Sequence, residues 1–379
     1  MTAVLAIACA VAAVYQAVAL VASLRHAARR DPAPAVFPPV SILKPVRGAD
    51  PRFLEAIRTH AVQDYPEFEI VFGAENPEDP AVEAIQALQS EFPSVAIRFV
   101  ECPTQAPNGK VGVLMDLARE ARHDVLLVSD SDIAVPPGYL RSVVAPLEDA
   151  GVGLVTCLYR ARSSTLAGVF EAIGIATDFV PGTLVAPLVG VREFGLGSTL
   201  VFRRADLEAI GGFAAISHFI ADDYQLARRI TQLGRRVHLS RTVVETTLGD
   251  ATWEGVWRHQ VRWARTIRVS RGAYVGLPVT FATVWALAAW LGAPGLRDLA
   301  AGLIALRMAV AFAAGWIVLR STLVLWYPFL VPFRDFWGVA VWAAGLFGNK
   351  VRWRDRSIVL RRDGRIASAR LIKTVDLRR

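Results

Sequence analysis

The stretch VLLVSDSDIAV, Val125–Val135, decides the fold that the sequence predicts. Its first five residues form a short, mostly apolar run, which is typical of a strand buried on both faces of a sheet. The run leads directly into Asp130, Ser131 and Asp132. Ligands of open α/β sheets bind outside the carboxyl ends of the strands. Two carboxylates at such an end can chelate a divalent cation and, through it, a diphosphate, although a D-x-D taken alone is more often an acidic surface turn.

Strand-like and helix-like segments alternate on both sides of this stretch. The alternation predicts a parallel sheet with helices on its faces, so we expect an α/β fold with a Rossmann-like, mostly parallel sheet. The predicted strands are Val40–Leu43, Glu69–Phe72, Val95–Val100, Val125–Ser129, Gly153–Leu158, Ser198–Phe202 and Arg236–Leu239, and the predicted helices are Pro51–Val62, Val82–Ser90, Val111–Arg122 and Asp222–Leu233.

The chain begins with an apolar segment that is long enough to cross a membrane. Hydrophobic residues make up 54% of the 379 residues, which is more than an ordinary soluble enzyme contains. Thr2–Leu24 is uninterrupted by charge, and about 20 apolar residues span the hydrocarbon core. A cleaved signal peptide is the alternative, but its charged leading region and short apolar core are missing here. Arg25, Arg29 and Arg30 follow the segment and place this end in the cytoplasm.

Three more apolar runs follow residue 272. If the domain after the first helix and the basic tail both lie in the cytoplasm, an even number of spans must connect them. We therefore expect Tyr274–Ala293 and Leu299–Leu319 to span the membrane. The third run, Leu323–Phe347, contains two prolines and a charged Arg-Asp pair that is costly in hydrocarbon, so we expect interfacial helices there. Arg307, inside the second run, is a charge that this assignment leaves unexplained.

The chain ends in a strongly basic tail. From Lys350 onward it holds eleven Lys and Arg residues and three Asp residues, so the tail alone carries the net charge of +8. A basic tail beside apolar segments is typical of a surface for anionic membrane lipids. Nucleic acid is the alternative partner, but no nucleic-acid-binding module is recognisable, so we expect no nucleic-acid partner. An Asp-Gly turn within Ile358–Arg365 predicts a small hairpin.

The three cysteines, Cys9, Cys102 and Cys157, are scattered and form no C-x-x-C pair. This usage predicts neither a disulfide framework nor a zinc site, and it suits a domain that faces the reducing cytosol. No obligate protein partner is indicated. The expected organisation is an N-terminal transmembrane helix with its basic flank (1–30), a proline-rich linker (31–39), an α/β domain (40–272), transmembrane and interfacial helices (273–348) and a basic cytosolic tail (349–379).

Four other short stretches carry polar side chains at positions that a single site could use. Each has an ordinary explanation when it is taken alone: solvated loop residues, carboxylates that favour a helix N-terminus through its dipole, or a membrane-interface belt. Their joint order in one chain indicates a site. The stretches are Lys44–Gly48, Glu75-Asn76, Asp222-Asp223 and His259–Trp263.

The same stretches occur in this order in the ceramide glucosyltransferase family (family 21), a group similar to the family 2-type GT-A membrane glycosyltransferases that includes bacterial hopanoid-biosynthesis relatives. The chain resembles this family from about Val40 to Arg268, and the basic C-terminal element is also similar. The resemblance implies a GT-A catalytic domain at 40–272 with N- and C-terminal transmembrane helices. The motifs that carry it are VSILKPVRGAD, QDYPEFEIVFGAENPEDPA, PNGK, VSDSDIAVPPGYL, GVGLVTCLYR, IADDYQLARRI and HQVRWAR.

The resemblance also implies roles for individual residues. Asp223 matches the general base of the family, and Asp132 matches its metal ligand, so the implied cofactor is a divalent metal, Mg²⁺ or Mn²⁺. Arg262 and Trp263 match the invariant pair of the (Q/R)-x-x-R-W motif, which closes over the sugar-nucleotide. The residues implied to bind the nucleotide-sugar are Lys44, Glu75, Asn76, Lys110, Asp130, Asp222, His259, Arg262 and Trp263.

Three positions depart from the pattern of the family. The family's first aspartate, which is expected to touch the uracil, aligns with Asn76, and Glu75 stands beside it. The RW motif opens with His259 where the family has Gln or Arg. After PNGK, the family often has an Asn where this chain has Gly112. The nucleotide base, the sugar and the acceptor are therefore left open by the sequence.

The implied activity is the inverting transfer of a hexose from a UDP-sugar to a lipid hydroxyl. The protein would be a multi-pass protein of the cell (inner) membrane whose catalytic domain faces the cytoplasm. UDP-glucose and ceramide, which give β-glucosylceramide, are the expected substrates, and UDP-N-acetylglucosamine with a hopanoid polyol is the first alternative. A processive polysaccharide synthase shares the D-x-D and RW motifs but needs more spans to line a pore. A non-catalytic membrane protein with a decayed nucleotide domain is the last alternative, which the intact DSD, Asp223 and RW residues oppose.

Overall fold

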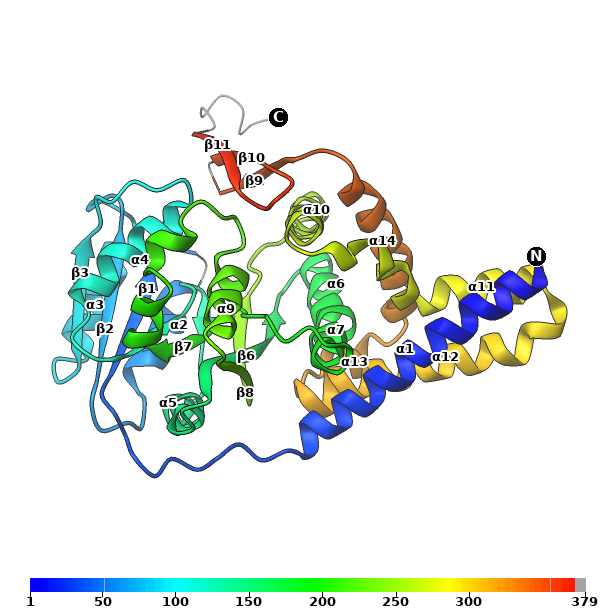
Figure 1. The fold of residues 1–379 in the computed structure, drawn as a ribbon, viewed down its shortest axis with the longest axis horizontal. Coiled ribbons are helices and arrows are strands. Elements are labelled where there is room, and N and C mark those ends of the chain that lie inside the picture. Colours follow the sequence, from blue (N-terminus) through cyan, green and yellow to red (C-terminus); the bar gives the residue numbers. More distant parts are fainter. Residues whose placement is uncertain (51, 355, 372–379) are drawn as a thin grey trace. The chain divides into compact units, whose positions relative to one another are not determined.

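The chain divides into two compact units that interleave along the sequence (Figure 1). The computed structural model describes residues 1–50, 52–354 and 356–371. The sheet unit comprises Arg30–Tyr159 and Arg192–Gly249. The helical unit comprises Met1–Arg29, Arg160–Val191 and the chain from Asp250 onward. Each unit is therefore assembled from segments that lie far apart in the sequence.

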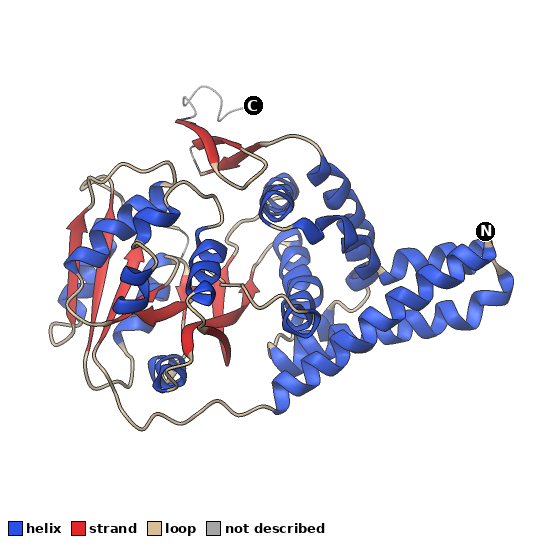
Figure 2. Ribbon diagram, in the orientation of Figure 1, coloured by secondary structure: helices blue, strands red, loops and turns tan. Residues whose placement is uncertain are grey.

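A mixed eight-stranded sheet forms the centre of the sheet unit (Figure 2). Its strand order is β3-β2-β1-β4-β7-β6-β8-β5, and the first four of these strands pair in parallel. β7 pairs antiparallel with β4 and β6, and β5 pairs antiparallel with β8. The predicted α/β class and all seven predicted strands are confirmed. The strands are β1 (Val40–Pro45), β2 (Phe68–Ala74), β3 (Ala96–Glu101), β4 (Val125–Val128), β5 (Ile133–Ala134), β6 (Val152–Arg162), β7 (Leu200–Arg203) and β8 (Arg236–Thr247).

The strand that leads into the DSD sequence is buried on both faces, as the sequence predicts. Leu127 packs into one hydrophobic layer, whereas Leu126 and Val128 pack into another. Successive side chains of a strand point to opposite faces, so each face of the sheet needs its own cover of helices. Helices α2 and α3 cover the first layer, and α4 and α9 cover the second.

The four predicted helices of the sheet unit are confirmed, although the predicted start of the first, Pro51, lies outside the described residues. Four shorter helical segments join them. The helices are α2 (Phe53–Ala61), α3 (Ala81–Glu91), α4 (Gly109–Glu120), α5 (Tyr139–Val144), η1 (Ala145–Glu148), α8 (Arg204–Ala209), η4 (Phe213–Ile216) and α9 (Asp222–Gln232).

The helical unit holds the long apolar helices of the chain and the amphipathic helix that carries the HQVRW sequence. Its helical segments are α1 (Thr2–Ala28), α6 (Leu166–Gly174), η2 (Ile175–Phe179), α7 (Val180–Val185), η3 (Ala186–Val189), α10 (Trp253–Ser270), η5 (Gly272–Thr280), α11 (Ala282–Gly292), η6 (Pro294–Leu296), α12 (Arg297–Phe312), η7 (Ala313–Val318), α13 (Leu323–Trp326) and α14 (Leu330–Leu346).

Within the described residues, three helical stretches are long and apolar enough to cross a membrane. They are Thr2–Ala28, Leu166–Val189 and Pro294–Val318. A fourth candidate is the pair Tyr274–Thr280 and Ala282–Gly292, which bends by 60° at its break and is either a broken span or a re-entrant loop. The sequence predicts one uninterrupted span there, whereas the structure shows a break. The structure also differs from the prediction at Leu166–Val189, which the sequence does not set apart from the α/β domain.

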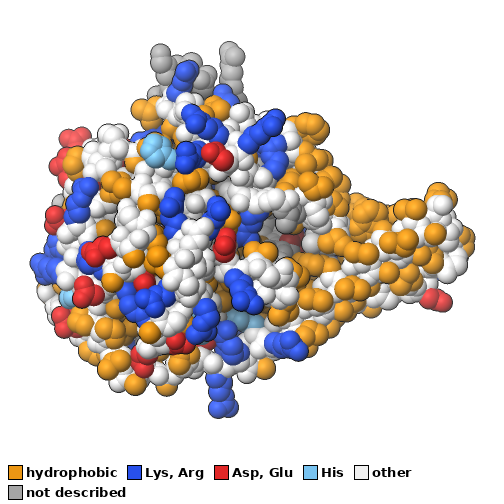
Figure 3. All heavy atoms as spheres, in the orientation of Figure 1, with side chains coloured by type: hydrophobic (Ala, Val, Ile, Leu, Met, Phe, Trp, Pro, Cys, Tyr) orange, Lys and Arg blue, Asp and Glu red, His pale blue; other side chains and the backbone are white. Residues whose placement is uncertain are grey.

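Helices α1, α11 and α12 lie side by side in the helical unit (Figure 1). Cys9 and Ala12 of α1 pack against Ala282, Ala286 and Ala289 of α11. Small side chains let helix backbones approach closely where lipid surrounds them. Large apolar side chains remain exposed on these helices and form the hydrophobic surface in Figure 3, which supports membrane association. They include Val4, Ile7, Val11 and Val14 on α1 and Leu287, Trp290 and Leu291 on α11.

Two arginines and two aspartates form a charge cluster in the helical unit that we call the buried charge cluster, because all of its members except the partly exposed Asp178 are buried. Arg307 Nη2 lies 2.7 Å from Asp178 Oδ1 and 2.9 Å from Asp335 Oδ1, and its Nη1 donates to the carbonyl oxygen of Thr177 at 2.8 Å. Arg334 pairs with Asp178 Oδ2 at 3.1 Å. The cluster accounts for Arg307 inside an apolar run. It also shows that the Arg-Asp pair of α14 is paired and buried, although the interfacial placement of α13 and α14 stays a prediction.

A small antiparallel sheet of order β11-β10-β9 follows α14. The predicted hairpin is confirmed as β10 and β11, and Gly364 in their turn has a φ of +81°, a conformation that favours glycine. Residues 372–379 of the predicted basic tail lie outside the described residues. The strands are β9 (Lys350–Trp353), β10 (Arg356–Leu360) and β11 (Ile366–Leu371).

Candidate active site

The acidic sequence at the end of β4 is held in place by β8. The short strand β5 directly follows Asp132, and its Ile133 pairs with Thr246. Thr246 also donates its hydroxyl proton to Asp132 Oδ2. Burial raises the pKa of Asp132, and the neighbouring Asp130 carboxylate raises it further. The Asp132 carboxylate is therefore fixed at a position where added positive charge would stabilise it.

Lys110 connects the DSD sequence to the acid pair at the start of α9. Its Nζ lies 2.7 Å from Asp130 Oδ1 and 3.4 Å from Asp222 Oδ2. Burial alone would lower the pKa of Lys110, but the carboxylates of Asp130 and Asp222 outweigh burial and raise it. The ammonium stays charged at neutral pH and brings two of the predicted aspartates together.

The PNGK sequence positions Lys110 by capping its helix. The Asn108 side chain accepts from the backbone N–H of Val111 at 3.4 Å, which satisfies an unpaired donor in the first turn of α4. The Asn108 amide also donates to the carbonyl oxygen of Phe219 at 2.9 Å. This bond ties the start of α4 to the segment just before α9, so Lys110 and the acid pair keep a fixed separation.

The two adjacent aspartates at the start of α9 have different surroundings. Asp222 is buried and shares the ammonium of Lys110. Asp223 accepts a hydrogen bond from the backbone N–H of Tyr224 at 2.7 Å. Burial raises the pKa of Asp223 to about 6, with a further contribution from the Asp222 carboxylate. One carboxylate is thus held as an ion pair, and its neighbour is a base with a pKa close to neutrality.

Two glycines let the segment before β7 pass against these acids. A Cβ at position 197 would lie 3.1 Å from Asp130 Oδ2 and 3.5 Å from Lys110 Nζ. A Cβ at position 195 would lie 2.7 Å from the carbonyl oxygen of Asp223. The sequence does not identify Gly195 and Gly197 as site residues, but the G-x-G spacing in FGLGS is a signal that could have indicated a close backbone approach.

Lys44 lies beneath the DSD sequence and has no exposed surface. Its Nζ donates to the carbonyl oxygen of Asp130 at 3.0 Å and to Ser129 Oγ at 3.2 Å, and it lies 3.3 Å from His60 Nε2. Burial lowers the pKa of Lys44 to about 7. The sequence predicts a nucleotide or diphosphate contact for this lysine, whereas here its three donors are used inside the protein, where they support the backbone of Asp130.

Glu75 and Asn76 lie at the carboxyl end of β2. A carboxylate oxygen of Glu75 is 3.8 Å from Arg47 Nη1. The side-chain oxygen of Asn76 accepts from the backbone N–H of Glu78 at 3.0 Å, so part of its hydrogen-bonding capacity is used in a turn. Both residues remain candidates for contact with the nucleotide base.

Asp79 joins the loops that end β1 and β2, and the sequence does not identify it. Its two carboxylate oxygens accept from the backbone N–H of Gly48 at 2.9 and 2.8 Å. The same carboxylate accepts from Ala81 N at 2.9 Å. The loop after each of these strands is therefore held at a fixed distance from its neighbour.

The three remaining predicted residues, His259, Arg262 and Trp263, lie on α10 of the helical unit. His259 Nδ1 pairs with the buried carboxylate of Glu171 on α6. The rings of His259 and Trp263 lie 4.6 Å apart between centroids. His259 therefore orients Trp263, and Glu171 orients His259. Sequence reasoning did not identify Glu171, which has no motif around it.

The same helix is also tied to α14. Gln260 Oε1 accepts from Trp337 Nε1 at 2.9 Å and from Arg334 Nη2 at 3.4 Å. On the other side of the helix, the Arg262 guanidinium lies over the ring of Trp353, 5.8 Å from its centroid. The HQVRW sequence is thus fixed through contacts with three other elements of its unit.

Comparisons with known proteins extend the motif-based resemblance. The profile of the family described as glycosyl transferase family 21 matches residues 4–366. Ceramide glucosyltransferase 1 of Caenorhabditis elegans is 27% identical over 220 residues, which are 57% of this chain and 46% of that protein. The ceramide glucosyltransferase of Komagataella phaffii is 32% identical over 120 residues, 30% of this chain and 24% of that protein. The matched parts thus cover less than half the length of these relatives.

A solved structure has a similar fold. Mannosyltransferase PcManGT from Pyrobaculum calidifontis, determined in complex with GDP-Man and Mn²⁺, aligns with 90% of this chain, and the alignment covers 99% of that chain. The TM-score is 0.53 and the sequence identity is 21%. The likeness confirms the predicted GT-A fold class.

Proposed function

The chain belongs to glycosyl transferase family 21, and from this premise we propose that it is an inverting glycosyltransferase that moves a hexose from a UDP-sugar to the hydroxyl group of a membrane lipid. UDP-glucose and ceramide are the proposed donor and acceptor, because the relatives with matching sequence are ceramide glucosyltransferases. The product of this reaction is β-glucosylceramide.

The observation that carries the proposal is the unequal environment of the two aspartates that start α9. Asp222 shares the charge of Lys110, whereas the pKa of Asp223 is raised to about 6 by burial and by the Asp222 carboxylate. An alcohol has a very high pKa, so its attack needs a carboxylate that removes the proton as the new bond forms. A group with a pKa near 6 is ionised at neutral pH and still basic enough to accept that proton. We assign this role to Asp223.

The chemistry is a single displacement at the anomeric carbon. The lipid oxygen bonds to C1 as the bond between C1 and the UDP oxygen breaks, and Asp223 takes the hydroxyl proton. A base that faces the acceptor lies opposite the departing UDP, so the configuration at C1 inverts and an α-linked donor gives a β-linked product. No covalent intermediate forms, and the reaction needs no second carboxylate as a nucleophile.

The departing diphosphate gathers negative charge that the site must stabilise. Asp130 and Asp132 present oxygen ligands of the kind that Mg²⁺ and Mn²⁺ prefer. Because burial and the Asp130 carboxylate raise the pKa of Asp132, a bound cation would stabilise its ionised form. These residues fit a divalent cation held chiefly by Asp132, and PcManGT was solved with Mn²⁺. No cluster of three or more His, Cys, Asp or Glu suited to a metal occurs in the described part of the chain, so diphosphate or water oxygens would complete the coordination. A bound cation would stabilise the charge of the leaving group.

The apolar helices support a lipid acceptor that stays in the bilayer during the reaction. Helix α1 and its two neighbours expose large apolar side chains, as a lipid-facing surface does. We propose an inner-membrane location with the sheet unit facing the cytoplasm, where UDP-sugars are made, and contact between the basic tail and anionic lipids. Trp263 and Arg262 are proposed to close over the sugar-nucleotide.

Product analysis tests the proposal. Membranes that contain the protein are incubated with UDP-glucose or UDP-N-acetylglucosamine and a total lipid extract, and the glycolipid formed is identified by mass spectrometry. The Asp223→Asn variant serves as the control. We expect hexosylceramide from UDP-glucose. A glycosylated hopanoid would replace the proposed acceptor, a long polysaccharide would replace the reaction class, and the absence of any sugar-containing product would contradict glycosyltransfer.

A further inference from the structure

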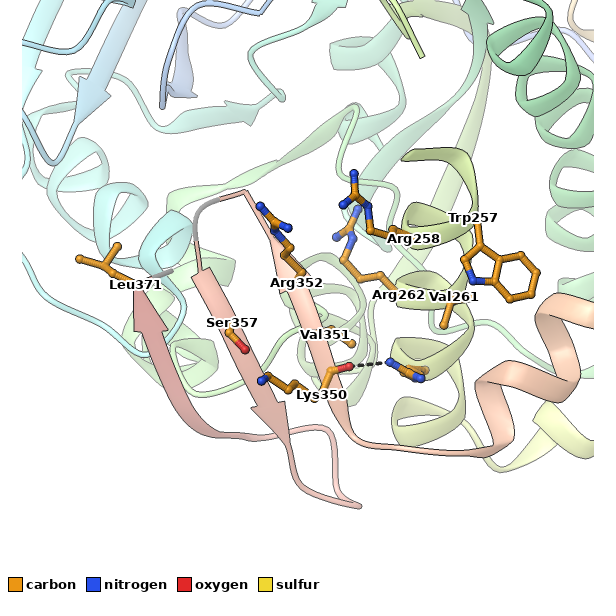
Figure 4. A pocket seen from close by; sticks show the side chains of 10 residues that line it. Trp257, Arg258, Val261, Arg262, Lys350, Val351, Arg352, Ser357 and Leu371 are labelled. Atoms are coloured by element: carbon orange, nitrogen blue, oxygen red, sulfur yellow. Dashed lines mark hydrogen bonds between the residues drawn. The ribbon is translucent and has the colours of Figure 1, made fainter. Parts of the chain in front are cut away.

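Lys44 is a buried cation of the sheet unit. In the helical unit, five cationic side chains line a pocket of about 590 Å³, and all five are at least partly exposed (Figure 4). Lys44, the last residue but one of β1, has no exposed surface. A buried charge is costly unless neighbouring groups stabilise it. The groups around Lys44 therefore indicate what this lysine does.

The register of the sheet places the Lys44 side chain beside the start of the DSD sequence. In the parallel pair of β1 and β4, Leu43 lies opposite Val128. The backbone N–H of Ser129 donates to the carbonyl oxygen of Leu43 at 3.3 Å, so the pairing continues one residue beyond β4. Lys44 Nζ donates to Ser129 Oγ at 3.2 Å and to the carbonyl oxygen of Asp130 at 3.0 Å. The ammonium therefore holds the chain at the point where β4 ends.

His60 of α2 supplies the third partner of Lys44. Its Nε2 lies 3.3 Å from Lys44 Nζ, and its Nδ1 lies 3.3 Å from the carbonyl oxygen of Ala56, one turn earlier in the helix. A carbonyl oxygen can only accept, so Nδ1 carries the proton and Nε2 accepts from the ammonium. Burial lowers the pKa of His60 well below its usual value, and the Lys44 charge lowers it further, so the ring stays neutral. Three acceptors thus match the three N–H donors of the ammonium.

The region of α2 holds the DSD sequence from both sides. Before the sequence, His60 acts through the buried lysine on the end of β4. After the sequence, Thr59 Oγ1 accepts from the backbone N–H of Val135 at 3.0 Å, and Gln63 Nε2 donates to the carbonyl oxygen of the residue after Val135, also at 3.0 Å. His60 and Gln63 are three residues apart, a spacing that places side chains on one side of a helical turn. The acidic segment is therefore fixed at both ends by neighbouring residues.

We infer that His60 is a positioning residue: through Lys44 it fixes the backbone of the DSD sequence and so the separation of the two carboxylates that would hold a divalent cation. The inference rests on the proposed function, because it concerns the cation implied there. If position 60 offered no acceptor, a buried N–H of Lys44 would lack a partner and the ammonium would no longer be held in place. Groups behind the ligands of a metal site orient those ligands and affect its affinity.

This role differs from the one that the sequence predicts. The family resemblance implies that Lys44 contacts the nucleotide or diphosphate, and it assigns no role to His60. In the structure, the contacts of Lys44 with Ser129, Asp130 and His60 are all inside the protein. A substitution at position 60 should therefore affect the cation more directly than the nucleotide.

Four substitutions separate positioning from a merely structural role. His60→Phe keeps a planar ring but removes the acceptor nitrogen, and Lys44→Met removes the ammonium from an unbranched side chain. His60→Gln keeps an oxygen that can accept and is the conservative variant. Ser41→Ala is the matched control, because Ser41 is a fully buried residue of the same strand whose hydroxyl donates to Glu69 Oε1 at 2.7 Å and makes no contact with the DSD sequence in the described structure.

The measurement is Mn²⁺ binding to the full-length protein in neutral detergent with saturating UDP, followed by electron paramagnetic resonance. It is made at a temperature at which thermal unfolding shows each variant to be folded. We expect His60→Phe and Lys44→Met to weaken Mn²⁺ binding about tenfold and His60→Gln to weaken it less than about threefold. Ser41→Ala should leave the Mn²⁺ affinity unchanged even if it lowers the melting temperature. In turnover assays, His60→Phe should raise the KM for Mn²⁺ more than it lowers kcat.

Unchanged Mn²⁺ affinity in His60→Phe would overturn the inference, even if Lys44→Met weakens binding. An equal loss in Ser41→Ala or in His60→Gln would overturn it as well. If the wild-type protein binds no Mn²⁺ in the presence of UDP, the inference fails together with the metal assignment. Glycosyltransfer itself is tested by its product, so its failure is distinguishable from each of these outcomes.

The tautomer of His60 gives a second measurement that does not need His60→Phe to fold. The protein is labelled with ¹⁵N-histidine, and the ring resonances that are present in the wild type and missing in His60→Gln are assigned to His60. At pH 7.5, we expect Nδ1 to be protonated and Nε2 to be unprotonated. The opposite tautomer would contradict the inference, because Nε2 could then not accept from Lys44.

Discussion

Lys110 makes two adjacent aspartates chemically different. Its ammonium lies 2.7 Å from Asp130 and 3.4 Å from Asp222, and it makes no ion pair with Asp223 in the described structure. Burial raises the pKa of Asp223, the neighbouring Asp222 carboxylate raises it further, and the charge of Lys110 opposes this rise. One aspartate is therefore paired with the buried cation and its neighbour is a base, and this difference can be tested by substitution.

We predict that Asp223→Asn lowers turnover about 10²- to 10⁴-fold, the usual cost of losing a general base. UDP affinity should barely change, because the base faces the acceptor. Asp222→Asn should act more mildly, since it removes an ion-pair partner of Lys110 without removing the base. Steady-state kinetics and UDP binding on both variants check this. If turnover falls this far in Asp222→Asn but not in Asp223→Asn, then the general base is Asp222 and the assignment to Asp223 is wrong.

The pH dependence of turnover should report the same carboxylate. Asp223 must be ionised to accept a proton, and its pKa is about 6. Turnover should therefore be constant above pH 7 and fall about tenfold per pH unit below pH 6. Asp222→Asn removes a negative neighbour, so the pKa of Asp223 should fall and the acidic limb should move to lower pH. A limb that moves to higher pH in this variant would contradict the electrostatic assignment.

Removal of the divalent cation should abolish turnover, and Asp132 should be the residue that it requires. We expect Asp132→Asn to lose roughly a hundredfold or more, because the charge of the departing diphosphate would be poorly stabilised. Thr246→Val keeps the carboxylate but removes the hydroxyl that holds it, so it should lose only about tenfold. Assays with excess EDTA and with added Mg²⁺ or Mn²⁺ check this. Full activity in excess EDTA would contradict a role for metal.

Several features of single residues were predictable from sequence, and others required the fold. Motif order identified Asp130, Asp222 and Lys110, and the structure brings these three together. The same reasoning could not foresee that Lys44 is fully buried, because burial depends on which helix covers the strand end. Nor could it identify Glu171, since an acid in an apolar segment gives no indication of a partner 88 residues away.

At the scale of helices and strands, periodicity predicted the sheet unit well and the helical unit less well. In the sheet unit, apolar residues follow the alternation of strands or the helical repeat of about 3.6 residues, and both patterns are visible in the sequence. The stretch Leu166–Val189 was not predicted as a possible membrane span, because Glu171 and Asp178 interrupt its apolar run. In the structure, both charges are paired with residues on other helices. Arg307 was unexplained for the same reason. A charged residue in an apolar helix indicates a partner, but sequence does not say where the partner lies.

The buried charge cluster should be essential to the packing of α12, α14 and η2. Arg307→Met would leave Asp335, a fully covered acid, without its main cation, and breaking a buried pair costs roughly 3 to 5 kcal/mol. Asp335→Leu should be equally harmful, because it removes one of the two acids that pair with Arg307 in the described structure. Thermal unfolding in detergent should show a large loss of stability for each single variant.

The double variant provides the control for that prediction. Arg307→Met with Asp335→Leu removes both charges together, so its loss should be smaller than the sum of the single losses. Asp178 would keep Arg334 as its partner at 3.1 Å. Additive losses in the three variants would show that the two residues contribute separately and that their ion pair is not important for stability.

At the scale of the whole molecule, the chain leaves the sheet unit twice. Residues 160–191 and the chain from 250 onward both belong to the helical unit, together with the first 29 residues. This interleaving could not be predicted from the sequence, because sequence segments show composition but not which of them pack together. The first helix is part of a packed unit, since Cys9 and Ala12 have no exposed surface.

Packing within the helical unit bears on how the chain crosses the membrane. A Cβ at Gly292 would lie 3.2 Å from Leu5 Cδ1, so the connection between α11 and α12 lies near the N-terminal end of α1. From the basic residues that follow α1, we predict that its other end is cytoplasmic. If α1 spans the bilayer, α11 and α12 form a hairpin that reaches the opposite side, and the bent pair is then a broken span instead of a re-entrant loop.

Single-cysteine labelling can decide between these two topologies. The three native cysteines are buried, so they give a low background for a membrane-impermeant maleimide. We predict that Asp124→Cys in the sheet unit and Arg362→Cys in the small C-terminal sheet, both at exposed positions, react only in inside-out vesicles. Asp298→Cys, exposed at the start of α12, should react only in right-side-out vesicles. If Asp298→Cys instead reacts from the same side as Asp124→Cys, then Tyr274–Thr280 and Ala282–Gly292 do not cross the membrane, and the cytoplasmic tail requires a different number of spans.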